Sequence, residues 1–120
     1  MSFPDPVVVL VAFMKSLTPV KVGSSLPPEY SYSAPFVVVE DGGGPGSVNH
    51  VLDQRRVIFK THAPTRREAS ELAEFIRKSI QDAHGVGWYW VADSAAPAFI
   101  PDDAKKPRYQ YTARVNLKRV

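Results

Sequence analysis

The residues that could carry out chemistry in this chain are few: three histidines and one pair of adjacent carboxylates. His50, His62 and His84 lie far apart, without the short spacing at which metal ligands usually occur. Asp102 and Asp103 could bind a divalent cation, but two adjacent acids in a loop supply only part of the oxygen shell that such an ion needs. The sequence therefore predicts no metal site.

A covalent or phosphate-binding mechanism finds equally little support. The chain has no cysteine, and no serine stands in the G-x-S-x-G pattern of a nucleophile elbow. Residues 42–46 are rich in glycine, but no Gly-Lys-Ser/Thr follows them, as a phosphate-cradling loop requires. Nothing singles out one pair of acids for glycoside chemistry. We expect a protein that is not an enzyme and that uses no cofactor.

Nucleic-acid binding is a second class of function, suggested by the C-terminal segment. Aromatic and basic side chains interleave there, as they do in proteins that stack bases: Arg108, Tyr109, Tyr111, Arg114, Lys118 and Arg119. Alternating residues of a strand point to opposite faces, so the tyrosines and most of the cations would not share one surface. The net charge of +3 is also small. A small basic nucleic-acid-binding module is therefore kept as an alternative.

Length and composition describe the scaffold that must position these residues. A chain of 120 residues fits one domain, and 44% hydrophobic residues argue against a disordered chain. The 11 prolines are close to twice the average share of about 5%, which predicts long loops. The longest apolar run, residues 7–14, is too short to cross a membrane, and no basic residue precedes Lys15, as a secretory signal would require. We expect a protein made in the cytoplasm without a membrane segment.

The first element is predicted to be a helix that is apolar on all sides. Asp5 and Pro6 have the residue types of an N-cap and a first helical position. Apolar residues then follow at helical spacing on one side (Val7, Leu10, Val11, Met14) and fill the other side as well (Val8, Val9, Ala12, Phe13). Such a helix must be covered on more than one side, and a subunit contact is one way to cover it. A buried strand over residues 7–11 is the alternative.

Four strands and a second helix complete the predicted fold. The strands are expected at residues 36–39, 53–61, 88–91 and 109–118, the last with one apolar and one polar face. The helix begins with the capping box from Thr65 to Glu68 and continues as an apolar stripe to Ala83. Long loops are expected at residues 18–35, 41–50 and 95–107. The order α-β-β-α-β-β predicts a single α+β domain over residues 1–120, with helices packed on a small, mainly antiparallel sheet.

Charge is strongly segregated along the chain. The formal charge is −3 over residues 1–54, +5 over 55–67, −5 over 68–103 and +6 over 104–120. Solvated surface is the simplest interpretation of this pattern. The other interpretation is that oppositely charged patches of neighbouring subunits meet.

Several short motifs occur in an order that spans nearly the whole chain. They are Phe3-Pro4-Asp5 before the apolar helix, Pro35-Phe36-Val37-Val38-Val39 before glycines, Ala63-Pro64-Thr65-Arg66 at the second helix, Pro101-Asp102, Pro107-Arg108-Tyr109 and the strand at 112–119. In this order the chain resembles the tail-terminator proteins of long, non-contractile-tailed actinobacterial phages. The motifs are structural rather than catalytic.

The resemblance implies a virion protein that forms a homo-oligomeric ring, usually a hexamer, at the head-proximal end of the tail. Such a ring stops polymerisation of the tail tube protein and offers a docking surface to head–tail connector proteins, while DNA passes through its lumen without sequence-specific binding. Another neck or head–tail connector protein is the alternative in the same assembly. We expect contacts between subunits or rings at Val8, Val9, Phe13, Tyr30, Tyr32, Gly42, Gly43, Gly44, Asp102, Asp103, Arg114, Lys118 and Arg119.

Overall fold

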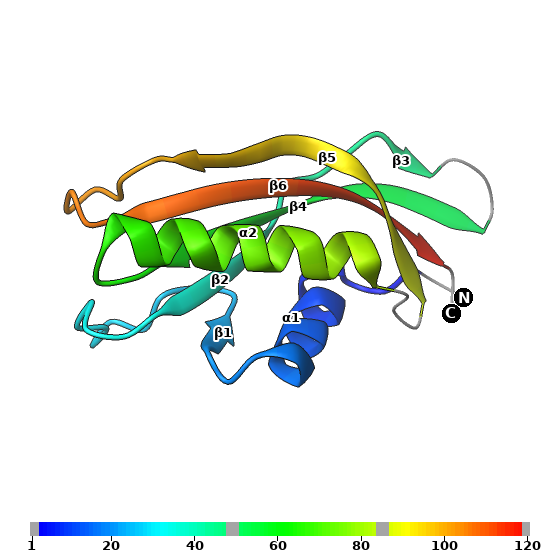
Figure 1. Cartoon of the computed structure of the whole chain (residues 1–120). Helices are drawn as coiled ribbons and strands as arrows, with labels where there is room; N and C mark the ends of the chain where they lie inside the picture. The colour runs from blue at the N-terminus through cyan, green and yellow to red at the C-terminus, as the bar shows by residue number, and fades with distance from the viewer. Residues whose placement is uncertain (1–2, 48–50, 84–86, 119–120) are drawn as a thin grey trace.

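The structure is a computed structural model that describes residues 3–47, 51–83 and 87–118. Both helices lie on the same face of one six-stranded sheet (Figure 1). The elements are α1 (Pro6–Leu17), β1 (Lys21–Gly23), β2 (Phe36–Asp41), β3 (Gly46–Ser47), β4 (Leu52–His62), α2 (Arg66–Asp82), β5 (Trp88–Phe99) and β6 (Arg108–Lys118). The predicted α+β class agrees with this arrangement. The predicted order α-β-β-α-β-β does not match it, because β1 and β3 add two short strands.

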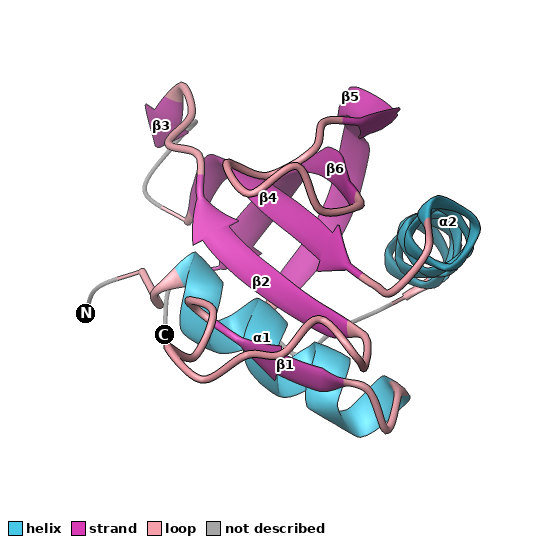
Figure 2. Ribbon diagram, turned by 90° about the vertical axis from the view of Figure 1, so that its left-hand side faces the viewer, coloured by secondary structure: helices cyan, strands magenta, loops and turns pink. Residues whose placement is uncertain are grey.

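The sheet is mainly antiparallel, as predicted, with its strands in the order β1-β2-β4-β6-β5. At its centre β4 and β6 pair in continuous register from Leu52 opposite Lys118 to His62 opposite Arg108. β1 departs from the antiparallel pattern, since it pairs in parallel with β2. β3 pairs with the beginning of β4, beyond the end of β2. The twist of this sheet and the position of the helices beside it are visible in Figure 2.

Alternation along the strands gives the sheet an inner face, toward the helices, and an outer face, away from them. The inner face and both helices share one buried core, which includes Leu10, Met14, Val37, Val39, Val57, Phe59, Ile76, Ile80, Tyr111, Ala113, Val115 and Leu117. The outer face of β4 and β6 carries polar and charged residues in the alternate positions, such as Arg56 and Arg114. The predicted division of the last strand into an apolar and a polar face is confirmed.

α1 confirms the helical interpretation of the N-terminal segment, and the alternative strand over residues 7–11 is wrong. Asp5 acts as the predicted N-cap, because its Oδ1 accepts a hydrogen bond from the N–H of Val7 at 2.8 Å. Leu10 and Met14 are buried against the sheet. Phe13 packs edge-on against Trp88, with 5.1 Å between the ring centroids.

α2 is the amphipathic helix that its apolar stripe predicts. The Oγ1 of Thr65 accepts a hydrogen bond from the N–H of Glu68 at 3.2 Å, which is one half of the predicted capping box. The buried side consists of Ala69, Ala73, Ile76 and Ile80. Asp93 of β5 links this helix to the sheet, because its carboxylate accepts hydrogen bonds from Arg77 Nε at 2.9 Å and from the Tyr111 hydroxyl at 2.6 Å.

Two of the predicted loops contain regular structure that the sequence pattern did not indicate. β5 continues to Phe99, so the predicted loop at 95–107 is wrong over its first part. The strand passes through three register shifts, between Trp90 and Ala92, Asp93 and Ala95, and Ala95 and Ala98. Such bulges let an edge strand accommodate Pro97 and a run of small residues, which interrupt the usual alternation. The predicted loop at 18–35 likewise contains β1.

The predicted glycine-rich tip at 41–50 is also partly wrong, because its first residues stay bonded to β4. Gly42 donates its N–H to the carbonyl of Arg56 at 2.8 Å, and the N–H of Arg56 bonds to the carbonyl of Gly43. Gly44 has a φ of +144°, and a Cβ there would lie 2.6 Å from the carbonyl oxygen of Gln54. Residues 42–47 therefore form a bent continuation of β2 along β4. Residues 48–50 of this predicted loop lie outside the described residues.

Candidate functional site on the outer face of the sheet

The outer face of the sheet carries two regions with unusual polar groups. One is a basic patch, which we define as Arg56, Arg114 and Lys118, at the end where β4 begins and β6 ends. The other is a pocket at the opposite end of β4, where the 24–35 and 100–107 loops cover the sheet. Arg114 and Lys118 were predicted contact residues, and Arg56 joins them only through the strand register. Arg119, also predicted, lies outside the described residues.

The basic patch places two guanidinium groups on neighbouring strands. Arg56 and Arg114 are direct cross-strand partners, and neither forms an ion pair with an acid in the described part of the chain. The Nε of Arg114 is buried without a hydrogen-bond partner among those residues. Like charges directly opposite each other destabilise a strand pair, and an unpaired buried donor adds a desolvation cost. This patch is therefore a surface where an anionic partner would be stabilising.

An aromatic ring lies next to the basic patch on the same face. Tyr89 of β5 is the cross-strand neighbour of Asn116, which donates a hydrogen bond to its hydroxyl at 2.8 Å. The Nζ of Lys118 lies 5.9 Å from the centroid of the Tyr89 ring. The two tyrosines of β6 lie at positions of the opposite face: Tyr111 is buried in the core, and Tyr109 is half-buried. The argument that aromatics and cations are on opposite faces therefore holds along β6 but not across β6 and β5.

The pocket is built from two loops and the outer face of the sheet. It has a volume of about 360 Å³ and is lined by the 24–26 segment, Tyr32, β2, β4 and the 102–104 segment. Its charged and titratable lining groups are Tyr32, Glu40, Lys60, His62, Asp102, Asp103 and Arg108. Lys60 and Glu40 form an ion pair at 3.0 Å. The predicted pair Asp102 and Asp103 is divided, since Asp102 is buried and Asp103 is exposed.

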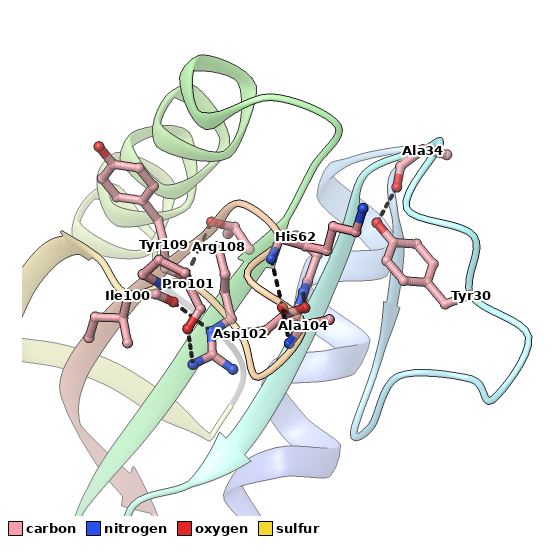
Figure 3. A network of polar contacts seen from close by, with 11 residues as sticks. Tyr30, Ala34, His62, Ile100, Pro101, Asp102, Ala104, Arg108 and Tyr109 are labelled. Carbon is pink, nitrogen blue, oxygen red and sulfur yellow. Dashed lines mark hydrogen bonds and ion pairs between the residues drawn. The ribbon is translucent and has the colours of Figure 1, made fainter.

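His62 and Asp102 face each other in this pocket, as Figure 3 shows. His62 is 2% exposed and Asp102 is 9% exposed. The distance from His62 Nδ1 to Asp102 Oδ2 is 3.9 Å, which is too long for a hydrogen bond, and neither atom has another partner among the described residues. Burial lowers the pKa of His62, and the positive charge of Arg108 lowers it further. The imidazole is therefore neutral at pH 7.

Backbone contacts hold the 100–107 loop in place around these two groups. The Oδ1 of Asp102 accepts hydrogen bonds from the N–H groups of Ala104 at 3.0 Å and Lys106 at 2.9 Å. Arg108 donates from Nε to the carbonyl oxygen of Ile100 at 2.9 Å (Figure 3). The carboxylate of Asp102 is thus fixed with one oxygen bound and the other directed at His62. Sequence analysis missed this site because it treated His62 as an isolated histidine.

The two predicted contact tyrosines form part of the loop next to the pocket. The hydroxyl of Tyr30 donates a hydrogen bond to the carbonyl of Ala34. The centroid of the Tyr30 ring lies 4.8 Å from the centroid of the Tyr32 ring and 6.1 Å from that of the His62 ring. Both tyrosines are half-buried. They therefore pack within the subunit, while part of each ring remains accessible.

The predicted contacts on α1 differ in how much they are exposed. Val8 is 65% exposed, whereas Val9 and Phe13 pack partly against the core of the same subunit. A groove of about 720 Å³ runs between α1 and β1, lined mainly by apolar residues that include Val8 and Val11. The surface of α1 that remains open to another molecule is therefore the side of Val8. Of the predicted glycines, Gly43 is exposed, Gly42 is half-buried and Gly44 is held close to β4.

A scan against protein-family profiles and a search of curated proteins each find no match to this chain. Within residues 3–47, 51–83 and 87–118, no group of three or more His, Cys, Asp or Glu is arranged to hold a metal ion. No helix in the same ranges is long and apolar enough to span a membrane. The functional proposal below is therefore based on the geometry of the outer face.

Proposed function

We propose that this chain is a structural subunit that assembles with copies of itself into a ring, and that the ring is a phage tail terminator. The observation that carries the proposal is the basic patch, where Arg56 faces Arg114 and neither forms an ion pair with a described residue. Negative charge on a neighbouring subunit would offset the repulsion between the two guanidinium groups and give the buried Nε of Arg114 an acceptor.

The same chain offers exposed acids on its other side. α2 carries four acids and four bases, and two of its acids are paired within the helix, Glu71 with Arg67 and Glu74 with Arg77. Glu68 and Asp82 are exposed and form no ion pair among the described residues. Because α2 packs on the inner face and the basic patch lies on the outer face, the two surfaces point in opposite directions. A contact between two unlike surfaces repeats from subunit to subunit and forms a ring when the rotation closes. The occupant that we assign to the basic patch is thus α2 of a second copy.

The kind of ring follows from the sequence resemblance. A tail terminator caps the head-proximal end of the tail tube, ends its polymerisation and presents a surface to the head–tail connector. The 42–47 and 100–107 segments are at the ends of strands, where they are available for contacts with rings above and below. The apolar groove beside Val8 offers a second surface for a neighbouring copy. In this function the protein is a virion component and has no catalytic role.

Oligomeric mass and tube growth test the proposal together. Purified full-length chain is expected to show a discrete ring mass by mass photometry at low salt, and that mass should decline in high salt, because charge pairs at a surface are screened. Added to growing tail tubes, the protein should arrest elongation. A strict monomer, with tube protein present, would contradict the ring. A ring that leaves tube growth unchanged would instead identify another neck or connector protein.

A small nucleic-acid-binding module is the second candidate, and the position of Tyr89 favours it. The ring of Tyr89 and the ammonium of Lys118 lie on one face, together with Arg114, as in surfaces that stack bases and contact phosphates. Binding to single-stranded or duplex DNA that weakens steeply with salt would support this function. If the protein does not bind DNA at low salt, this second function is excluded.

A further inference from the structure

The pocket formed by the 24–35 and 100–107 loops contains two buried polar atoms with no partner among the described residues: His62 Nδ1 and Asp102 Oδ2. Buried polar atoms are nearly always hydrogen-bonded to protein or to ordered water, so an unpaired pair in two residues that line one cavity marks a place where a bound group would be stabilising. At 3.9 Å apart, the two atoms can both accept hydrogen bonds from one donor atom that lies about 2.9 Å from each, to one side of the line that joins them.

The chemistry of these two atoms selects the kind of group that fits. A carboxylate oxygen only accepts hydrogen bonds, and a neutral imidazole can present Nδ1 as an acceptor. In the tautomer that leaves Nδ1 as an acceptor, the group that satisfies both atoms is a donor. An anion such as phosphate or a carboxylate would instead meet the free oxygen of Asp102 and be repelled.

The charges around the pocket favour a cationic donor over a neutral one. Lys60 is already paired with Glu40 at 3.0 Å, and the guanidinium of Arg108 is bound to the backbone carbonyls of Ile100 and Pro101. Oδ1 of Asp102 accepts two backbone N–H groups, and the Tyr32 hydroxyl lies close to the same carboxylate. Asp103 adds a second carboxylate at the rim. A buried carboxylate without a cation is costly, and a bound cation would offset that cost.

We propose that this pocket is a binding site for a primary ammonium group, which donates hydrogen bonds to Asp102 Oδ2 and to His62 Nδ1. A volume of about 360 Å³ leaves room for an alkyl chain behind the ammonium. The ammonium comes either from a small aliphatic amine or from a lysine side chain of another protein. This inference uses none of the residues of the basic patch and does not depend on the ring proposed above.

The test is a titration of the full-length ¹⁵N-labelled protein with n-butylammonium at pH 7, followed by NMR. Saturable shifts are expected at the His62 imidazole and at the amides of Ala104 and Lys106, which bond to Asp102. Butanol, a neutral molecule of similar size, should cause none. A parallel titration with Nα-acetyl-lysine amide separates the two sources, because tight binding of only one probe identifies that source.

Two variants of neighbouring residues provide the matched comparison. Asp102→Asn keeps an oxygen for the two backbone N–H groups but removes the charge, and it should weaken butylammonium binding about tenfold or more. Asp103→Asn removes an equal charge from the exposed rim and should weaken binding much less. Unsaturable shifts, equal responses to butylammonium and butanol, or equal effects of the two variants would each overturn the proposal. So would a pocket that binds Zn²⁺ but no amine. The butanol comparison requires no variant, so the proposal remains testable if Asp102→Asn does not fold.

Discussion

Arg56 and Arg114 lie directly opposite each other on β4 and β6, on the face of the sheet that neither helix covers. Two like charges in a cross-strand pair work against the fold of the isolated subunit. A pair of this kind separates the requirements of folding from those of assembly, because a change that helps the isolated subunit should harm its contact with an acidic partner.

Arg114→Glu is predicted to weaken assembly without destabilising the subunit. The new carboxylate would face Arg56, so the stability of the isolated subunit should stay equal or rise by about 0.5 kcal/mol. Ring formation should fall, and fall further when Lys118→Glu is added. Thermal denaturation and mass photometry on the same samples measure the two effects. Lys21→Glu, at an exposed position of β1, is the control and should leave ring mass unchanged. Parallel loss of stability and assembly would contradict the prediction.

Gly44→Ala is predicted to destabilise the subunit by about 2 kcal/mol. At a φ of +144°, a methyl group would lie 2.6 Å from the carbonyl oxygen of Gln54, so the bent continuation of β2 would have to move. Gly43→Ala is the matched control, because Gly43 also has a positive φ, +74°, but nothing lies within 4 Å of an added Cβ. Urea denaturation should show the larger loss for Gly44→Ala. Equal losses would mean that the contact with β4 is unimportant.

Asp93→Ala is predicted to cost about 2–3 kcal/mol of stability, since it removes the acceptor that links α2 to the sheet. The Tyr111 hydroxyl would lose its partner in the core, and Arg77 would lose its ion pair. Asp82→Ala, an exposed acid in the last turn of α2, should have almost no effect or a small stabilising one. Chemical denaturation of both variants compares them directly. A small effect of Asp93→Ala would show that hydrophobic contacts alone hold α2.

The stability of the subunit is predicted to fall as the pH is lowered through and below about 6.5 because of His62. Burial lowers the pKa of His62, so the unfolded chain binds a proton at a higher pH than the folded protein does. Between those two pKa values the unfolded state holds more protons, and acid therefore favours unfolding. His62→Gln should flatten this part of the profile.

The carboxylates account for a different part of the pH profile. Burial alone would raise the pKa of Asp93, but hydrogen bonds from Tyr111, Arg77 and Gln81 lower that pKa below its usual value. The stability that Asp93 contributes is therefore lost only in stronger acid, as the pH falls below about 3.9, the usual aspartate pKa. Denaturation midpoints measured from pH 7 to pH 3 resolve the two steps. An unchanged slope between pH 7 and pH 5 in His62→Gln would contradict the assignment to His62.

Local patterns in the sequence were sufficient for the elements whose signals are short in range. The cap at Asp5, the cap at Thr65 and the helical spacing of apolar residues correctly predicted α1 and α2. Alternation predicted the two faces of β6 for the same reason, because side-chain direction in a strand depends only on position along it. The length of β5 was missed, since three bulges interrupt its pattern and only pairing with β6 reveals it.

Which residues of the outer face become neighbours was decided by tertiary structure. The sequence contains Arg56 and Arg114, but only the register of β4 against β6 makes them neighbours, and only β5 brings Tyr89 beside Lys118. The pairing of His62 with Asp102 likewise requires the 100–107 loop to fold back over β4. Residue types and local spacing determined helices, strand faces and the absence of cysteine chemistry. Long-range pairing determined the rest, because contacts between distant segments follow from the packing of the whole sheet and not from the pattern of any one segment.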